Sequence, residues 1–210
     1  MLMRAPRESG SWTWILDDMP GPVLEFALTT AARMSAVLAK HELLELHSLE
    51  WAWSHADRGG LGGDSRLSVS ASSLAGPAFP DRLRACHPQA QIGSITLLGT
   101  GSWFDAGGER HKEYRLMEVL LVPDETEIWV ELSVHHDVWG QCDFRGRPQP
   151  LIHAHNAPRL AAALREIDQV LGVAAEPGEV TFYGRAEGYG LAAPDIIDGL
   201  GPDLTNATFG

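Results

Sequence analysis

The chain has 210 residues, of which 44% are hydrophobic and 21% charged, a composition that favours a packed globule over a disordered chain. Its formal net charge is −12 and its pI is about 5.1. Such a chain repels phosphate backbones and anionic lipid heads, so we expect neither nucleic acid nor membrane as a partner. The N-terminus has no leader pattern and no apolar run could span a bilayer, so we expect a cytoplasmic protein with reduced thiols at Cys86 and Cys142.

The first third of the chain predicts strand, helix and strand in turn. Aromatic and β-branched side chains favour a strand over residues 11–16, and apolar residues at helical spacing predict a helix from Val23 to about Lys40. Residues 49–54 alternate between apolar and polar side chains, as in a strand with one buried face. Four glycines within residues 59–63 then indicate a loop or hairpin tip.

A short strand at residues 66–71 and a helical turn at residues 81–86 lead into the clearest pattern of the chain. There the sequence predicts four strands joined by short turns, which should form an antiparallel meander. Gly99 and Gly101 are interpreted as turn residues. The four predicted strands cover residues 92–104, 113–122, 126–134 and 138–144.

The last third of the chain predicts one helix followed by irregular structure. Asn156 is a suitable N-cap for a helix over residues 157–171, and Gly172 suits its end. Residues 180–183 favour a further strand, and residues 184–210 an irregular tail. The whole chain, residues 1–210, is therefore predicted to be a single α+β domain, in which two amphipathic helices pack on a meander of about five to seven strands.

The predicted hairpin of residues 126–134 and 138–144 supplies the candidate functional surface. One parity of these strands is apolar and should face the core, whereas the other combines two tryptophans with four carboxylates. An aromatic anchor beside carboxylates is suited to receive arginine or lysine from a partner protein. The alternative is that the helix of residues 157–171 covers this face and the tryptophans belong to the core. The candidate partner-binding residues are Glu127, Trp129, Glu131, Asp137, Trp139 and Asp143.

Four histidines give the second candidate site. His135 and His136 are adjacent, and His153 and His155 would point to one face if that segment were extended, as two ligands of a metal ion would. No established zinc, nucleotide-binding or nucleophile-elbow motif accompanies them. We therefore predict no catalytic residue, no metal and no cofactor, and we interpret Cys142 as a core thiol.

The motifs from Arg145 to Pro150, from Asn156 to Leu164 and from Thr181 to Gly184 together resemble a recurring segment of uncharacterised proteins from GC-rich soil bacteria. In type alone, a small acidic α+β protein without a catalytic signature is similar to the immunity proteins of polymorphic toxin systems, which bind and block a cognate toxin. This likeness implies a non-enzymatic, cytoplasmic bacterial protein that neutralises a basic toxin domain. A metal-assisted hydrolase that uses the four histidines and a small-ligand carrier are the alternatives.

Overall fold

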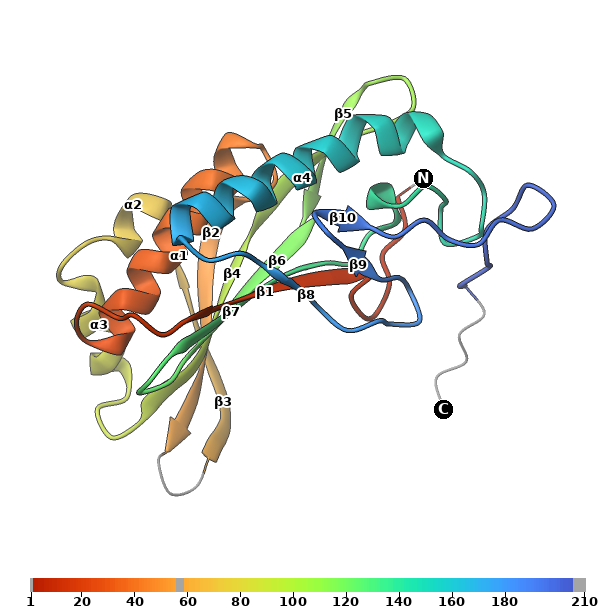
Figure 1. Cartoon of the computed structure of the whole chain (residues 1–210). Coiled ribbons are helices and arrows are strands. Elements are labelled where there is room, and N and C mark those ends of the chain that lie inside the picture. Colours follow the sequence, from red (N-terminus) through yellow and green to blue (C-terminus); the bar gives the residue numbers. More distant parts are fainter. Residues whose placement is uncertain (1, 56–58, 206–210) are drawn as a thin grey trace.

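The computed structural model describes residues 2–55 and 59–205, and it places two long helices across one face of an antiparallel sheet (Figure 1). Every strand pair in this sheet is antiparallel, and the fold class is therefore α+β, as predicted; among the described residues this sheet has eight strands. One of the eight, β5 (Arg110–Tyr114), pairs with β4 alone. The other strands lie in the order β3 (Gly59–Ser68), β2 (Glu45–His55), β4 (Gln91–Phe104), β6 (Met117–Pro123), β7 (Ile128–Val134), β1 (Gly10–Leu16) and β8 (Glu176–Pro177).

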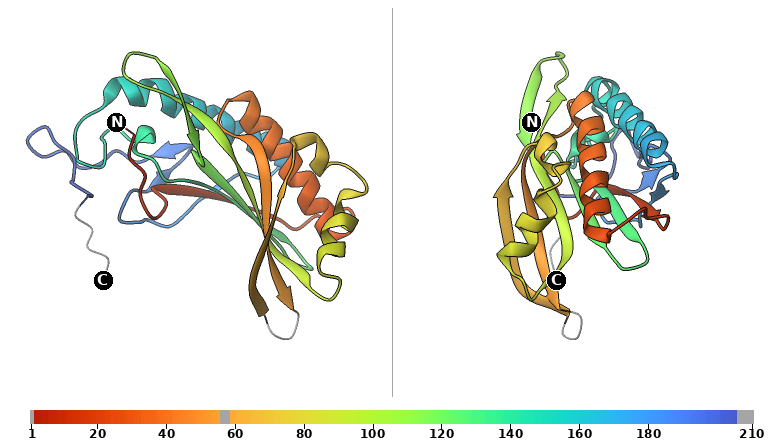
Figure 2. Two further views of the ribbon diagram at one scale, coloured as in Figure 1. Left: turned by 180° about the vertical axis from the view of Figure 1, so that it is seen from behind. Right: turned by 90° about the vertical axis from the view of Figure 1, so that its left-hand side faces the viewer.

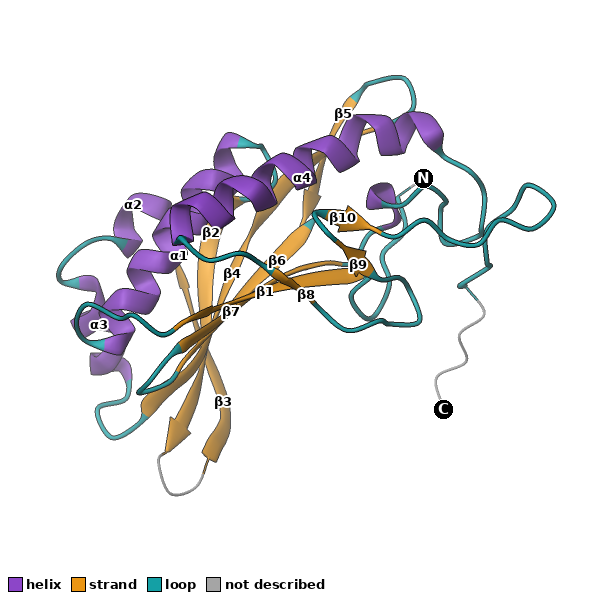
Figure 3. Ribbon diagram, in the orientation of Figure 1, coloured by secondary structure: helices purple, strands orange, loops and turns teal. Residues whose placement is uncertain are grey.

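Helices α1 (Val23–Lys40) and α4 (Pro150–Leu171) cover the same face of the sheet, and Figure 3 shows both lying across the strands. The shorter helices α2 (Ala71–Leu74) and α3 (Phe79–Cys86) pack against α1. The sheet seen from behind in Figure 2 carries no helix. One layer of helices on one face of a sheet leaves the other face to solvent or to a partner.

The core lies between the helices and the covered face of the sheet. Helix α1 has the bounds that its apolar spacing predicts, and its side chains Leu28, Met34 and Leu38 are at most 1% exposed. The core assignment of the four tryptophans in the N-terminal third is also confirmed. Their exposures range from 0% to 6%: Trp12, Trp14, Trp51 and Trp53.

The glycines of β3 and β4 play other roles than the sequence predicts. The glycine-rich segment from Gly59 belongs to β3, paired with β2, and the connection at residues 56–58 lies outside the described residues. Gly101 lies inside β4, where a Cβ atom would stand 2.2 Å from the carbonyl oxygen of Leu43. Glycine at this position therefore allows a close approach of two backbones, and it does not form a turn.

The fourth strand predicted for the meander, over residues 138–144, is not formed. The chain enters a 3-10 turn, η1 (Asp137–Trp139), because polar groups hold it there. The Asp137 carboxylate accepts the N–H of Met3 at 3.0 Å, and the Gln149 side-chain amide donates to the carbonyl of Asp137 at 2.6 Å. The place beside β7 is taken instead by β1, which pairs with it along seven residues.

Helix α4 begins at Pro150, seven residues earlier than predicted, and it ends at Gly172 as predicted, with φ of 77° at that glycine. Asn156 is therefore an interior residue and not the N-cap. Residues 180–183 form a turn closed by hydrogen bonds to Gly184, and the expected strand is absent there. The C-terminal segment adds a small hairpin, β9 (Ala186–Glu187) and β10 (Gly190–Leu191). None of the helices in residues 2–55 and 59–205 is long and apolar enough to cross a membrane.

Candidate functional site on the open face of the sheet

The uncovered face of the sheet carries a cluster of apolar side chains around one carboxylate. Because side chains alternate along a strand, the residues between the core positions of β1, β6 and β7 all point to this face. Cross-strand pairing sets them in two rows. We call this cluster the open-face patch, and its members are Thr13, Ile15, Leu120, Val122, Trp129 and Glu131.

The first row of the patch is apolar. Trp129 on β7 lies opposite Ile15 on β1 and opposite Val122 on β6. Ile15 is 44% exposed, and the indole of Trp129 and the side chain of Val122 are partly exposed. A half-open indole between two aliphatic neighbours loses the rest of its water contact when a partner covers it, which is how aromatic anchors contribute to binding.

The second row places a carboxylate between an aliphatic and a hydroxyl side chain. Glu131 lies opposite Leu120 and Thr13, is partly buried, and makes no hydrogen bond or ion pair with any described residue. Burial raises the pKa of Glu131, and the negative charge of Glu8 raises it further. A carboxylate that has lost part of its water without gaining a cation is a site where an arginine or lysine would bind favourably.

The two connections beside the patch add negative charge to this end of the sheet. Five acidic residues follow β1 or lie between β6 and β7, and all of them are exposed. None forms an ion pair with a described residue. Together they give this end of the sheet a local negative potential that attracts cations. They are Asp17, Asp18, Asp124, Glu125 and Glu127.

The basic residues at the other end of the open face are already paired. Arg4 and Arg115 bind the carboxylate of Glu118 at 2.6 Å and 2.7 Å. Burial raises the pKa of Glu118, but the hydrogen bonds from Arg115 and Arg4 outweigh this effect and lower the pKa. These arginines therefore neutralise Glu118 and leave the charge of Glu131 without compensation.

Ser133 and His135 lie next to Glu118 but do not form a nucleophile relay. His135 Nε2 is 3.4 Å from Ser133 Oγ and 3.8 Å from Glu118 Oε1, so both groups face the same ring nitrogen. A serine–histidine–carboxylate triad needs the serine and the acid on opposite nitrogens. The buried Nδ1 of His135 has no hydrogen-bond partner among the described residues, and burial lowers the pKa of this imidazole.

The structure brings only half of the predicted partner-binding residues together. Trp129 and Glu131 lie on the open face, with Glu127 at the turn before β7. The other three lie away from the open face, because the strand predicted over residues 138–144 is not formed. Asp137 is 2% exposed, Trp139 is fully buried under α4 as the alternative interpretation expected, and Asp143 accepts the N–H groups of Arg145 and Arg147 in a local turn.

Sequence reasoning missed the partners of Trp129. Ile15 and Val122 both follow an alternation that is readable in their own strands, but the sequence does not show that β1 and β6 flank β7. The pairing of β1 with β7 joins residues more than 110 positions apart, and no local pattern encodes it.

The four histidines of the alternative hypothesis, a metal-assisted hydrolase, do not form one group of ligands among the described residues. His153 and His155 lie on helix α4. Residues that are two positions apart on a helix point to different sides of it. His136 is buried, and its Nδ1 lies 3.3 Å from the carbonyl oxygen of Leu116. Among the described residues, the ligand atoms of one group of three lie within 4.8 Å of one another: Asp105, Glu109 and His111.

Hydrogen bonds within the β4–β5 hairpin account for that group. Asp105 Oδ1 accepts the N–H groups of Gly107 and Glu109, both at 2.9 Å, and its Oδ2 lies 3.1 Å from His111 Nε2. These contacts close the turn between the two strands. The geometry is that of a hairpin turn, and it needs no metal ion to explain it.

Comparison with known proteins gives no indication of function, so the function has to be argued from the geometry of the structure. No protein-family model, no curated protein and no solved structure matches this chain.

Proposed function

We propose that this chain is a non-enzymatic protein-binding protein whose open-face patch receives a basic segment of a partner. The observation that carries the proposal is Glu131, a partly buried carboxylate without a counter-ion, beside the half-open indole of Trp129. A partner arginine or lysine at Glu131 would supply the missing charge, while its aliphatic stem would cover Trp129 and Ile15. The exposed acids around the patch would steer such a partner toward it.

An immunity protein that blocks a basic toxin domain is the specific form of this function that we propose. The net charge of −12 supports it, because the active surface of an enzyme that acts on nucleic acid is basic and would be attracted to this end of the sheet. In that case the partner at the open-face patch is a toxin, and its activity is lost in the complex.

Site-specific photocross-linking tests the proposal. We replace Ile15 with benzoylphenylalanine in the full chain and irradiate it in extract of the cells that produce it, with Leu151 on α4, which is 58% exposed, as the matched control position. We expect a cross-linked product from position 15 that is absent from position 151. The cross-linked partner peptide should contain arginine or lysine.

Charge reversal at the patch provides the decisive variant. Glu131→Arg should weaken binding of the identified partner at least tenfold, about 1.4 kcal/mol, because it places a like charge against the basic segment. Trp129→Ala should weaken binding by a similar factor. Glu109→Arg, an equal charge change in the β4–β5 hairpin, should leave affinity unchanged. Equal cross-linking from both positions, or unchanged affinity for Glu131→Arg, would overturn the proposal.

A further inference from the structure

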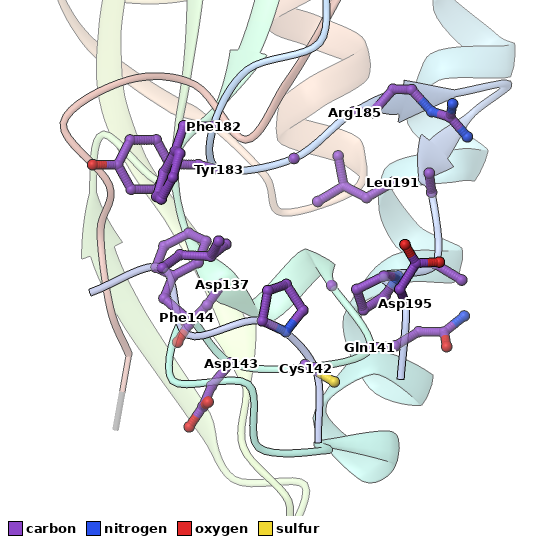
Figure 4. Close-up of a pocket in the computed structure, with 18 of the residues that line it drawn as sticks. Asp137, Gln141, Cys142, Asp143, Phe144, Phe182, Tyr183, Arg185, Leu191 and Asp195 are labelled. Atoms are coloured by element: carbon purple, nitrogen blue, oxygen red, sulfur yellow. The ribbon is translucent and has the colours of Figure 1, made fainter. Parts of the chain in front are cut away.

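A second candidate site lies away from the open-face patch, where the C-terminal segment folds over the turn after η1. The two segments enclose a cavity of about 810 Å³ between residues 140–144 and residues 180–204 (Figure 4). This volume lies within the range of roughly 300–1,000 Å³ that is typical of small-molecule sites.

Aromatic and aliphatic side chains form much of the cavity wall. The rings of Phe144 and Tyr183 meet edge to face with centroids 5.9 Å apart, and Phe182 stands against Tyr183 at 5.3 Å. Leu191 lies on the opposite side of the cavity (Figure 4). The wall therefore offers apolar and π surface that a hydrophobic ligand body can cover.

The rim of the cavity exposes an unusual amount of apolar surface. Val180 is 69% exposed, Phe182 58%, Ile197 73% and Leu200 52%. Single exposed apolar side chains are ordinary on protein surfaces, but four of them line this one cavity, a concentration of the kind that marks a binding site.

The charged groups that line the cavity are predominantly acidic. Three aspartates line it, Asp137, Asp143 and Asp195, and Arg185 is the one basic residue among the described lining residues. The guanidinium of Arg185 is 3.3 Å from the carboxylate of Glu187, so its charge is partly compensated. The cavity therefore combines apolar walls with a negative potential, and it disfavours an anionic ligand.

We propose that this cavity binds a small organic cation, with its apolar body against Phe144, Tyr183 and Leu191 and its ammonium group toward Asp195. A carboxylate attracts the ammonium group by charge, while the aromatic and aliphatic walls take the apolar body out of water. The site does not use any residue of the open-face patch, so it stands independently of the proposed partner binding.

Three probes with nearly the same body separate charge from hydrophobicity. We titrate the full-length protein by calorimetry with phenethylammonium, 2-phenylethanol and 3-phenylpropanoate. Phenethylammonium should bind at least tenfold more tightly than 3-phenylpropanoate, and the neutral alcohol should fall between them. Equal affinity of the cation and the anion, or no binding of any probe at millimolar concentration, would show that the proposal is wrong.

Variants locate the site. Asp195→Asn should weaken phenethylammonium binding several-fold and reduce its preference over the anion, because the exposed carboxylate is lost without a change in shape. Ala193→Trp fills the cavity from an exposed lining position and should abolish binding, with circular dichroism confirming the fold. Ile15→Ser in the open-face patch is the matched control and should leave binding intact. Unchanged binding in both cavity variants would contradict the assignment.

Discussion

At the scale of single residues, the adjacent pair His136 and Asp137 shows how burial sets ionisation. Burial lowers the pKa of His136 to about 4, and the charge of Arg4 contributes to this shift. Burial also raises the pKa of Asp137 to about 6, although the hydrogen bond from the Met3 N–H opposes the rise. In the folded protein the imidazole of His136 is therefore neutral at neutral pH, whereas Asp137 takes up its proton only below about pH 6.

These two shifts have opposite effects on stability in the same pH range. On acidification from 6.5 to 4 the unfolded chain protonates His136 before the folded chain does, so stability falls. Over the range from about 6 to 4 the folded chain protonates Asp137 first, so stability rises. The wild-type protein should therefore show a partial cancellation of these two contributions.

Asp137→Asn should remove the contribution of Asp137 to the pH dependence of stability and leave that of His136. Relative to the wild type, the variant should gain about 2–3 kcal/mol of unfolding free energy as pH rises from 4 to 7, because it lacks the buried carboxylate that ionises over this range. Urea denaturation of both proteins at several pH values measures the difference. A difference that stays constant with pH would refute the assignment of a raised pKa to Asp137.

At the scale of elements, Asn156 explains how α4 is held against the sheet. Its side chain accepts the N–H of Phe104 at 2.9 Å and donates to the Phe104 carbonyl at 2.7 Å, so it replaces a strand neighbour at the end of β4. It also donates to the carbonyl of Ile152 within the helix. The residue that suits an N-cap in the sequence is thus a fully buried link between helix and strand.

Asn156→Ala should destabilise the protein by about 2–3 kcal/mol, because both backbone groups of Phe104 lose their partner. His155→Ala, at the exposed neighbouring position, should change stability by less than about 0.5 kcal/mol. Chemical denaturation of the two variants provides the comparison. Equal stability of Asn156→Ala and the wild type would show that water replaces these hydrogen bonds.

The elements that the sequence predicts well are those with local signals. Helix α1 has both predicted ends, and β4 and β7 lie close to their predicted bounds, because periodicity and turn residues are encoded locally. The single strand predicted over residues 113–122 is divided by a turn into β5 and β6. The segment after Val134 has the alternation of a strand, yet its backbone groups pair with Met3 and Gln149. Three of the six candidate residues therefore lie away from the open face, since tertiary hydrogen bonds override a local pattern.

At the scale of the whole molecule, Asp168 connects the two ends of the chain. Its Oδ1 on α4 accepts the indole N–H of Trp14 in β1 at 2.7 Å and the backbone N–H of Ala175 at 3.0 Å. Its Oδ2 accepts the hydroxyl of Tyr189, between β9 and β10, at 2.7 Å. One carboxylate thus joins the first strand, the last helix and the C-terminal hairpin.

Asp168→Ala should lower the unfolding free energy by about 3 kcal/mol, because the indole N–H of Trp14 and two further donors lose their acceptor. Asp168→Asn keeps one side-chain oxygen and should lose less than half as much. Urea denaturation followed by tryptophan fluorescence measures both. Equal losses in the two variants would contradict a role for the Oδ1 hydrogen bonds.

The pairing of β1 with β7 also determines when the sheet can be completed during synthesis. Residues Gly10 to Leu16 leave the ribosome early, whereas their partners from Ile128 to Val134 emerge more than a hundred residues later. Until then the nascent chain holds β1 without its neighbouring strand, and the indoles of Trp12 and Trp14 also await α4 and the C-terminal hairpin, to which they donate hydrogen bonds. The nascent chain therefore exposes aromatic side chains for as long as β7 has not been synthesised. We expect chaperones that recognise exposed aromatic segments to bind it during this time.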